Sequence, residues 1–233
     1  MKKIRFSFVI PTYNEGRYLE DCLRSIRNQT RGDYEIIVAD SRSGDNTRKI
    51  AKKYGAKIVL DERRGPGSAR NKGAKAAKGG LLIFTDADVR FEKDFLEKID
   101  SRFEKGVGGC IFFLMPYDAP SASLKFSYTM TNYIAMLLTS LGSVMTAGSC
   151  FAYRKDVFTR AGGFNPEFLT NEDHDLAKRS ARIMPFRFFK DITVYTSCRR
   201  VVNKGFIKMT WTYTKSSMVF FLNRGYLRDY WKD

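Results

Sequence analysis

Carboxylates recur in this sequence just after short apolar runs, where the strands of a sheet would end. Four of them have this placement: Glu15, Asp40, Asp86 and Asp88. Acidic side chains gathered at one sheet edge either bind a cation or accept hydrogen bonds from a ribose and a base. In an extended backbone Asp86 and Asp88 point to the same side, which suits Mg²⁺ or Mn²⁺, hard cations that take oxygen ligands and share them with phosphates. The alternative is that this pair caps a helix over Phe91–Ile99.

A glycine-rich run, Arg64–Asn71, precedes a segment rich in alanine and lysine. Glycines let the backbone approach a ligand closely, and a helix N-terminus attracts anions. Arg70 could then pair with phosphate oxygens. The equally open alternative is a tight turn with a solvated arginine.

A third acidic segment, Asn171–Asp175, begins an expected helix after the Gly- and Pro-marked loop Gly162–Pro166. Acidic residues in a first helical turn are ordinary partners of the helix dipole, so this segment alone indicates no function. His174 is the only histidine, and we expect it to be a structural or supporting group rather than a metal ligand.

The cysteines exclude a zinc site. They are widely separated and form no Cys-x-x-Cys pair: Cys22, Cys110, Cys150 and Cys198. Structural zinc requires clustered cysteine and histidine ligands. Buried, reduced thiols in a cytoplasmic protein are therefore expected.

The elements that would position these side chains alternate between strand and helix over the first hundred residues. Strands are expected over Phe6–Ile10, Tyr34–Ala39, Lys57–Leu60 and Leu81–Thr85. Helices are expected from about Leu19 with Asn14 as N-cap, from about Asn46 to Gly55, and over Ser68–Lys78. This order predicts an α/β fold with a parallel, doubly wound sheet. Ligands of such sheets bind beyond the carboxyl ends of the strands.

The second half is less regular. Strands are expected over Val107–Leu114, Gly148–Tyr153 and Phe186–Thr196, and helices over Leu124–Ser140 and Glu172–Ile183. The length of 233 residues fits one domain with a modest extension. We divide it into a nucleotide-sugar-binding half (1–115), an acceptor-binding half of the same domain (116–198) and a C-terminal extension (199–233).

Charge and hydropathy limit the possible partners. The net charge of +16 points to nucleic acid, an anionic membrane surface or phosphorylated substrates. Lys2, Lys3 and Arg5 lead directly into a short apolar run, so no signal peptide is predicted. The uncharged stretch between Lys125 and Arg154 is long enough to span a bilayer, but it is too rich in Ser, Thr and Asn to do so.

The ordered motifs together resemble those of the family 2 glycosyltransferases. The opening motif is Phe8–Glu15, the second Asp40–Thr47, the third Gly65–Asn71, the metal motif Asp86–Asp88, and the catalytic acidic motif Asn171–Asp173 with Leu176 and Arg179. Gly162–Asn165 stands where members commonly have a Gly-Gly-Phe segment. The resemblance covers roughly residues 4 to 200. It implies an A-type glycosyltransferase fold, with a Rossmann-like, mostly parallel sheet and helices on both faces.

The resemblance also implies which residues hold the donor, a UDP- or GDP-linked sugar. Pro11, Thr12 and Glu15 would contact its ribose and base, and Asp40 would accept from the base. Arg70 would lie near the diphosphate. Gly67 and Ala87, within the third motif and the metal motif, are assigned to the same site.

For the chemical step, the resemblance implies a single inverting displacement that depends on Mn²⁺ or Mg²⁺. Asp88 would bind the cation, and Asp86 would bond to the ribose, to a metal-bound water or to the metal itself. Asp173 would be the general base that takes the acceptor's proton. These roles are chemically consistent, because a cation neutralises the departing diphosphate while a carboxylate removes the proton.

One segment departs from the family pattern. Many members carry a histidine after the last core strand that completes the metal shell. Here that stretch is Val194–Arg200, which has none. Arg199 and Arg200 are the residues that could hold phosphate there instead, and a third protein ligand for the metal is not identified.

The C-terminal extension suggests where the acceptor is. From Arg199 onward there are eight Lys or Arg, two Asp and eight aromatic residues, a net charge of +6. We expect a basic amphipathic helix at an anionic membrane surface, on the inner face of the cell membrane. Relatives with lipid-linked acceptors often carry such an element, and a glycan acceptor is the other expectation. A helix packed on the core or one that mediates self-association stays open.

Three other functions compete with glycosyl transfer. A nucleic-acid-binding protein would gather its basic residues on one motif, whereas here they are scattered and the acidic cluster would repel phosphates. No nucleic-acid partner is therefore expected. A sugar nucleotidyltransferase would need a Gly-rich loop after Ile10, which is absent. The third is a non-catalytic homologue that binds nucleic acid or membrane.

Overall fold

The computed structural model of the chain describes residues 3–63, 65–104, 106–142, 146, 148–168 and 170–205, without the side chain of Lys204. The strands are β1 (Phe6–Thr12), β2 (Tyr34–Asp40), β3 (Lys57–Leu60), β4 (Leu81–Thr85), β5 (Val89–Phe91), β6 (Gly109–Pro116), β7 (Cys150–Arg154) and β8 (Phe186–Thr196). The helices are α1 (Leu19–Arg27), α2 (Thr47–Lys53), α3 (Pro66–Ala76), α4 (Phe95–Phe103), α5 (Ala122–Ser140), α6 (Lys155–Arg160), α7 (Glu172–Ala181) and α8 (Arg199–Lys204). Arg64 and the expected amphipathic helix beyond Gly205 lie outside the described residues.

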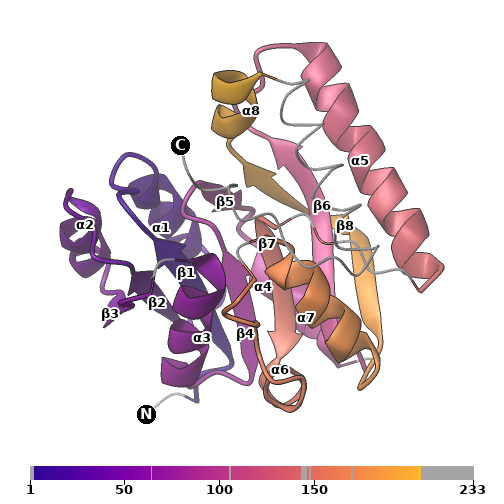
Figure 1. Cartoon of the computed structure of the whole chain (residues 1–233), viewed down its shortest axis with the longest axis horizontal. Coiled ribbons are helices and arrows are strands. Elements are labelled where there is room, and N and C mark those ends of the chain that lie inside the picture. The colour runs from indigo at the N-terminus through magenta and orange to yellow at the C-terminus, as the bar shows by residue number, and fades with distance from the viewer. Residues whose placement is uncertain are drawn as a thin grey trace.

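One sheet runs through the molecule in the order β3-β2-β1-β4-β7-β6-β8-β5, with helices on both of its faces (Figure 1). The first four strands in this order are parallel, as the sequence predicts. Beyond them β7 is antiparallel to both neighbours, while β8 is parallel to β6. The expectation of a mostly parallel sheet with helices on both faces is confirmed, but the doubly wound description applies only to the first half.

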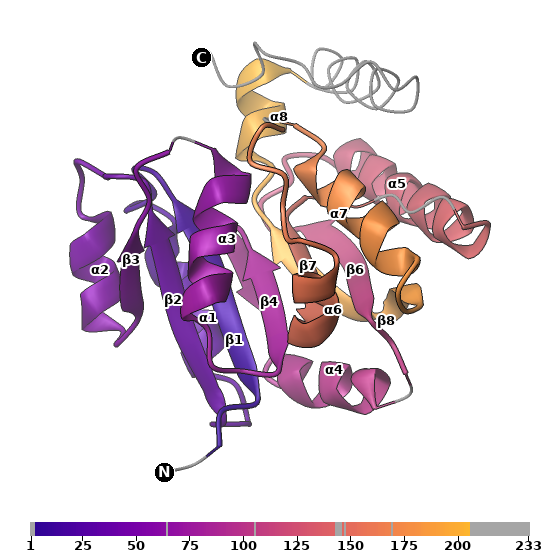
Figure 2. The ribbon, with the colours of Figure 1, turned by 60° about the horizontal axis from the view of Figure 1, so that its bottom comes forward.

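Burial on both faces explains why β1 is a continuous apolar run rather than an alternating one. Phe8 and Ile10 point into a core that includes α1 and α4. Val9, between them, points into the opposite core with residues of α3, α6 and α7. Helix α3 lies especially close to the sheet, as a Cβ added to Gly73 would come only 2.4 Å from Val9 Cγ1. Figure 2 shows α3, α6 and α7 in front of the sheet.

One local prediction and one alternative are wrong. Asn14 does not cap α1, which begins at Leu19 after Tyr18. It adopts φ 54° and accepts a hydrogen bond from Gly44 N at 2.8 Å, because it closes the loop between the first two motifs. Nor does the Asp86–Asp88 pair cap a helix. The chain continues into β5, which pairs with β8, and α4 starts only at Phe95.

Within the described part of the chain, no helix is both long enough and apolar enough to cross a bilayer.

Candidate active site

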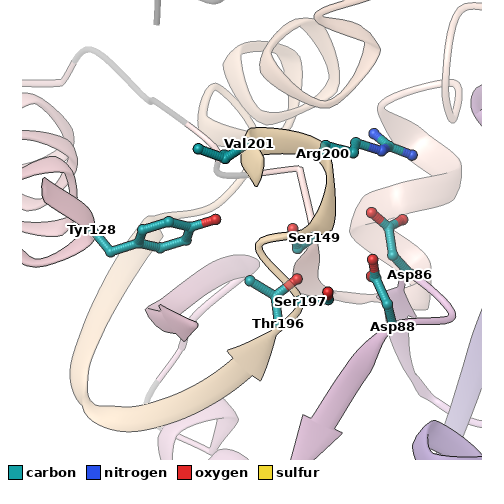
Figure 3. A pocket seen from close by; sticks show the side chains of 8 residues that line it. All are labelled: Asp86, Asp88, Tyr128, Ser149, Thr196, Ser197, Arg200 and Val201. Atoms are coloured by element: carbon teal, nitrogen blue, oxygen red, sulfur yellow. The ribbon is translucent and has the colours of Figure 1, made fainter. Parts of the chain in front are cut away.

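Two of the four motif carboxylates, Asp86 and Asp88, meet in one pocket at the carboxyl edge of the sheet. A pocket at this edge is lined by Asp86, Asp88, Tyr128, Ser149, Thr196, Ser197, Arg200 and Val201. Figure 3 shows the carboxylates of Asp86 and Asp88 side by side, pointing the same way, with the guanidinium of Arg200 close above them. Two acidic motif residues and a basic residue from the end of the described chain therefore share one cavity.

Asp88 is held by an arginine from the segment where a histidine was expected. The Nε of Arg199 lies 2.8 Å from Asp88 Oδ2, and its Nη2 donates to Glu15 Oε1 at 2.8 Å. The guanidinium also stacks over the ring of Tyr18, 4.1 Å from its centroid. Arg199 thus neutralises two of the four carboxylates that the sequence analysis singled out.

The ion pair with Arg199 does not fully offset the cost of burying the negative charge of Asp88. Its side chain is 8% exposed. Burial, together with the charge of Asp86, raises its pKa to about 6, and Arg199 and Arg200 oppose the rise. A buried carboxylate whose charge is still unfavourable attracts further positive charge.

Asp86 is held by a different arginine, Arg70, which links it to α7. Arg70 Nη2 donates to Asp86 Oδ1 at 2.9 Å, and Nη1 donates to Glu172 Oε1 at 2.7 Å. The guanidinium lies over the rings of Phe151 and Phe164, 5.2 and 5.7 Å from their centroids. The alternative of a solvated arginine is wrong, because this side chain is 4% exposed.

Replacing Arg70 by Met is expected to lower the free energy of unfolding by roughly 3 to 5 kcal/mol, since it leaves Glu172 and Asp86 without their buried partner. Urea unfolding at neutral pH measures the loss. The double variant R70M/E172Q removes one of the two stranded charges and should recover part of it. If R70M and the wild type unfold at the same urea concentration, Arg70 does not hold the two motifs together.

The N-terminus of α7 carries Asp173 in a polar niche. His174 donates to Asp173 Oδ1 from its backbone N at 3.0 Å, and its ring Nδ1 lies 3.1 Å from the same oxygen. Burial raises the pKa of Asp173, but His174 and a hydrogen bond from Thr146 outweigh it and bring the pKa to about 2. Asp173 is therefore ionised at neutral pH.

Its neighbour Glu172 behaves in the opposite way. Burial and the charge of Asp173 raise the pKa of Glu172 to about 7, although Arg70 opposes this. Two adjacent carboxyl groups thus have pKa values pushed apart, an arrangement typical of acid–base sites. Asp173 does not line the pocket described above, but a Cβ on Gly148 would lie 3.6 Å from its Oδ2, and Gly148 adjoins the pocket residue Ser149.

The residues predicted to bind the nucleotide lie at the ends of β1 and β2. Thr12 Oγ1 donates to Asp40 Oδ1 at 3.1 Å, and Ser43 N donates to Asp40 Oδ2 at 3.0 Å. Asp40 is fully buried. Glu15 Oε2 is also buried and has no hydrogen-bond donor among the described residues. Pro11 is half-buried beside them.

Two further predicted residues pack inside the protein. Gly67 lies against α7, where a Cβ would be 3.3 Å from Phe164 Cβ and 3.5 Å from Glu172 Cγ. Ala87 belongs to the apolar core beneath the Asp-x-Asp pair. Both support neighbouring site residues in this structure, and their contact with a donor stays a prediction.

Two residues at the site, Asp118 and Tyr128, were missed from the sequence. Asp118 accepts from Ser197 Oγ at 2.6 Å and from Cys198 N at 2.7 Å, which anchors the segment that carries Arg199 and Arg200. Tyr128 reaches the pocket from α5. An acidic residue just after β6 was the available signal for Asp118, but nothing in the sequence pointed to Tyr128.

The carboxylates of Asp86 and Asp88 fit a divalent cation only if a bound substrate and water supply its other oxygen ligands. No group of three or more His, Cys, Asp or Glu side chains that could hold a metal is found within the described ranges. Asp86 and Asp88 offer two carboxylates on one side of the pocket. Mg²⁺ commonly binds one or two carboxylates and takes its other oxygens from substrate phosphates and water. These residues therefore fit such a cation, provided that Arg199 leaves Asp88.

Comparison with known proteins agrees with this geometry. The family model described as Glycosyl transferase family 2 matches residues 7–162. Glycosyltransferase AglE of Haloferax volcanii is 29% identical over 186 residues, which cover 75% of this chain and 60% of that protein. This chain therefore spans less than two thirds of the length of AglE.

Two other similarities extend over nearly the whole chain. The dolichyl N-acetyl-alpha-D-glucosaminyl phosphate 3-beta-D-2,3-diacetamido-2,3-dideoxy-beta-D-glucuronosyltransferase of Methanococcus voltae is 27% identical over 260 residues, covering 97% of this chain and 76% of that enzyme. The solved structure of glucosyl-3-phosphoglycerate synthase from Mycobacterium tuberculosis, with Mn²⁺, UDP and glucosyl-3-phosphoglycerate, has a TM-score of 0.66 at 17% identity, covering 95% of this chain and 80% of that one. The structural likeness identifies the A-type glycosyltransferase fold.

Proposed function

The chain belongs to glycosyl transferase family 2, and from that premise we propose that it transfers a sugar from a nucleoside diphosphate to an acceptor by a single inverting displacement. The observation that carries the proposal is the link made by Arg70. This residue joins Asp86 in the pocket to Glu172 on α7. It therefore ties the donor-side carboxylates to the helix that presents Asp173.

For the donor we propose a UDP- or GDP-linked sugar whose nucleoside lies over the ends of β1 and β2. The buried Oε2 of Glu15 supports this, because it has no donor in the described chain and can accept from a ribose hydroxyl. The M. tuberculosis synthase of the same fold holds UDP. Thr12 and Asp40 form the floor of this site through their mutual hydrogen bond.

For the cofactor we propose Mn²⁺ or Mg²⁺, held by Asp88 and Asp86 together with the diphosphate. When bound, the cation would neutralise charge on the leaving diphosphate. Asp88 must exchange its ion pair with Arg199 for this role. Arg199 and Arg200 would then be placed to pair with phosphate oxygens, which a guanidinium binds well.

For the chemical step we propose Asp173 as the general base. It is ionised at neutral pH and buried at the N-terminus of α7, so its carboxylate can accept a proton from an acceptor hydroxyl. His174 holds that carboxylate in place, and Thr146 contacts both the carboxylate and the His174 ring. Glu172, one residue away, shares the same charged network through Arg70.

For the acceptor we propose a glycan or a lipid-linked phosphate used in cell-envelope or glycolipid synthesis, at the cytoplasmic face of a membrane. The Methanococcus relative is named for a dolichyl phosphate acceptor. The net charge of +16 favours an anionic surface, where each basic residue contributes roughly 1 kcal/mol of attraction. The tail aromatics Trp211, Phe220, Phe221 and Trp231, outside the described residues, would add apolar contacts.

A thermal-shift screen across UDP-, GDP- and dTDP-sugars with Mn²⁺ tests donor binding. We expect one nucleotide class to raise the melting temperature with Mn²⁺ and to do so less with EDTA, since a ligand that binds only the folded chain stabilises it. If no nucleotide sugar shifts the melting temperature at saturating concentrations, the non-catalytic alternative replaces glycosyl transfer.

A further inference from the structure

Helix α5 carries an apolar stripe that faces away from the protein. Among the described residues, nine large apolar side chains are exposed, and six of them belong to α5 or the residue that follows it. They are Phe126 (63% exposed), Met130 (40%), Tyr133 (47%), Ile134 (54%), Leu137 (58%) and Leu141 (72%). Spacings of three and four residues place them along one side of a helix, so together they form a continuous surface rather than scattered exposures. We call this set the α5 stripe.

The opposite side of α5 anchors the helix to the sheet. Asn132 accepts from Leu114 N and donates to Leu114 O, both at 2.8 Å. Leu124, Ala135 and Thr139 are buried on the same side. Tyr133, at the edge of the stripe, also contacts Phe113 of β6, with ring centroids 6.0 Å apart. Since the inner side already fastens α5 to β6, the other members of the α5 stripe are not required to hold the helix in the fold.

The charges of α5 favour an anionic partner. Between Ala122 and Leu141 the only charged residue is Lys125, so no carboxylate lies along the stripe. The chain as a whole carries +16. A second copy of the chain would bring the same positive charge, which opposes self-association, whereas an anionic bilayer attracts it.

The helix also joins the stripe to the candidate active site. Tyr128 lies two residues from both Phe126 and Met130, on another side of the helix, and lines the pocket that contains Asp86, Asp88 and Arg200. Figures 1 and 2 both place α5 at the side of the molecule opposite β3. A bilayer against α5 would therefore lie beside the pocket and far from the nucleotide half.

We propose that the α5 stripe inserts into the interfacial region of an anionic lipid bilayer and brings the pocket to the level of the lipid headgroups. This docking role goes further than the proposed function, on which it rests for the identity of the pocket. An exposed apolar helix face lies in the interface plane of a membrane when anionic lipids attract the protein. A lipid-linked phosphate acceptor would then reach Arg200 from the headgroup layer without leaving the bilayer.

The first test uses a fluorescent label on the stripe of the full chain. The four native cysteines are buried, so an added Cys at position 137 can be labelled selectively with an environment-sensitive dye such as NBD. The matched control carries Leu60→Cys, because Leu60 is 52% exposed but lies on β3 at the far edge of the sheet. Vesicles of phosphatidylcholine with phosphatidylglycerol should shift the emission of the Leu137→Cys label to shorter wavelength and leave the control unchanged.

Each other result overturns the proposal. A shift without vesicles that grows with protein concentration means that a second copy covers the stripe. If the label at position 137 already emits at shorter wavelength than the Leu60→Cys control without vesicles, at every protein concentration, the chain's own residues 206–233 cover the stripe. No shift with vesicles means that no bilayer docks there.

Vesicle flotation provides the second measurement. The variant I134S/L137S should lower the vesicle partition coefficient by about tenfold, and Leu60→Ser should not change it. Donor-induced thermal stabilisation of both variants should equal that of the wild type. Loss of flotation with intact donor binding supports docking, and unchanged flotation overturns it. Because donor binding is measured without lipid, failure of the docking proposal is distinguishable from failure of the glycosyltransferase proposal.

Discussion

Replacing Asp173 by Asn is expected to lower kcat by about 100-fold or more, as removal of a positioned general base does, while donor affinity stays within about twofold. The amide is nearly the same size as the carboxylate but cannot accept the acceptor's proton. His174 and Thr146, which contact Asp173 in this structure, can still contact the amide oxygen. Steady-state kinetics of nucleoside diphosphate release, with calorimetric titration of the donor, measure the two quantities separately.

Asp175→Asn is the matched control for this substitution. Asp175 lies in the same helical turn and pairs with Arg179 at 2.6 Å, away from Asp173. The Asp175→Asn variant should retain the wild-type rate of glycosyl transfer. An Asp173→Asn variant with normal turnover would exclude Asp173 as the base, and Glu172→Gln then becomes the next variant to examine, since the raised pKa of Glu172 also suits proton transfer.

Replacing Asp88 by Ala is expected to abolish Mn²⁺-dependent donor binding. Asp88 presents a buried carboxylate to the pocket, beside Asp86, and no third acidic or histidine ligand accompanies them in the described chain. A cation held by so few protein ligands cannot lose one of them without a large loss of affinity. Calorimetric titration of the donor with Mn²⁺ and with EDTA should give the same weak affinity for the variant and different affinities for the wild type.

The substitution Arg199→Ala distinguishes the role of the Asp88 carboxylate from that of its ion-pair partner. It frees Asp88 without removing the carboxylate, since Arg199 Nε is the group that lies 2.8 Å from it. The Mn²⁺ dependence should therefore persist in Arg199→Ala, even if phosphate contacts weaken the donor affinity. Unchanged donor affinity in Asp88→Ala, with and without EDTA, would remove Asp88 from the cation site.

Local signals in the sequence were sufficient to predict the strands that surround the proposed donor site. Apolar runs that end in Pro11, Asp40 and Asp86 correspond to β1, β2 and β4, because buried parallel strands are apolar on both faces. The acidic cluster at the sheet edge follows from this order, since parallel strands bring their carboxyl ends together. Strand β5 was missed because its three residues are too few to show a period.

Long-range pairings were beyond the reach of sequence reasoning. Arg70 meets Glu172 across 102 positions of the chain, and Arg199 meets Glu15 across 184. Nothing local distinguishes these arginines from solvated ones, because their partners depend on how α3, α7 and α8 pack on the sheet. The stripe on α5 was visible only as an uncharged stretch, and its outward orientation required the structure.

The central claim is that the chain transfers a sugar with inversion at the anomeric carbon. Proton NMR of the reaction with the donor class selected by the thermal-shift screen, a lipid-linked phosphate acceptor and Mn²⁺ tests it most directly. The account predicts release of the nucleoside diphosphate together with a glycosylated acceptor whose anomeric configuration is opposite to that of the donor. A product that retains the donor's configuration, or the absence of any product with both the lipid-linked phosphate and a glycan acceptor, would contradict it.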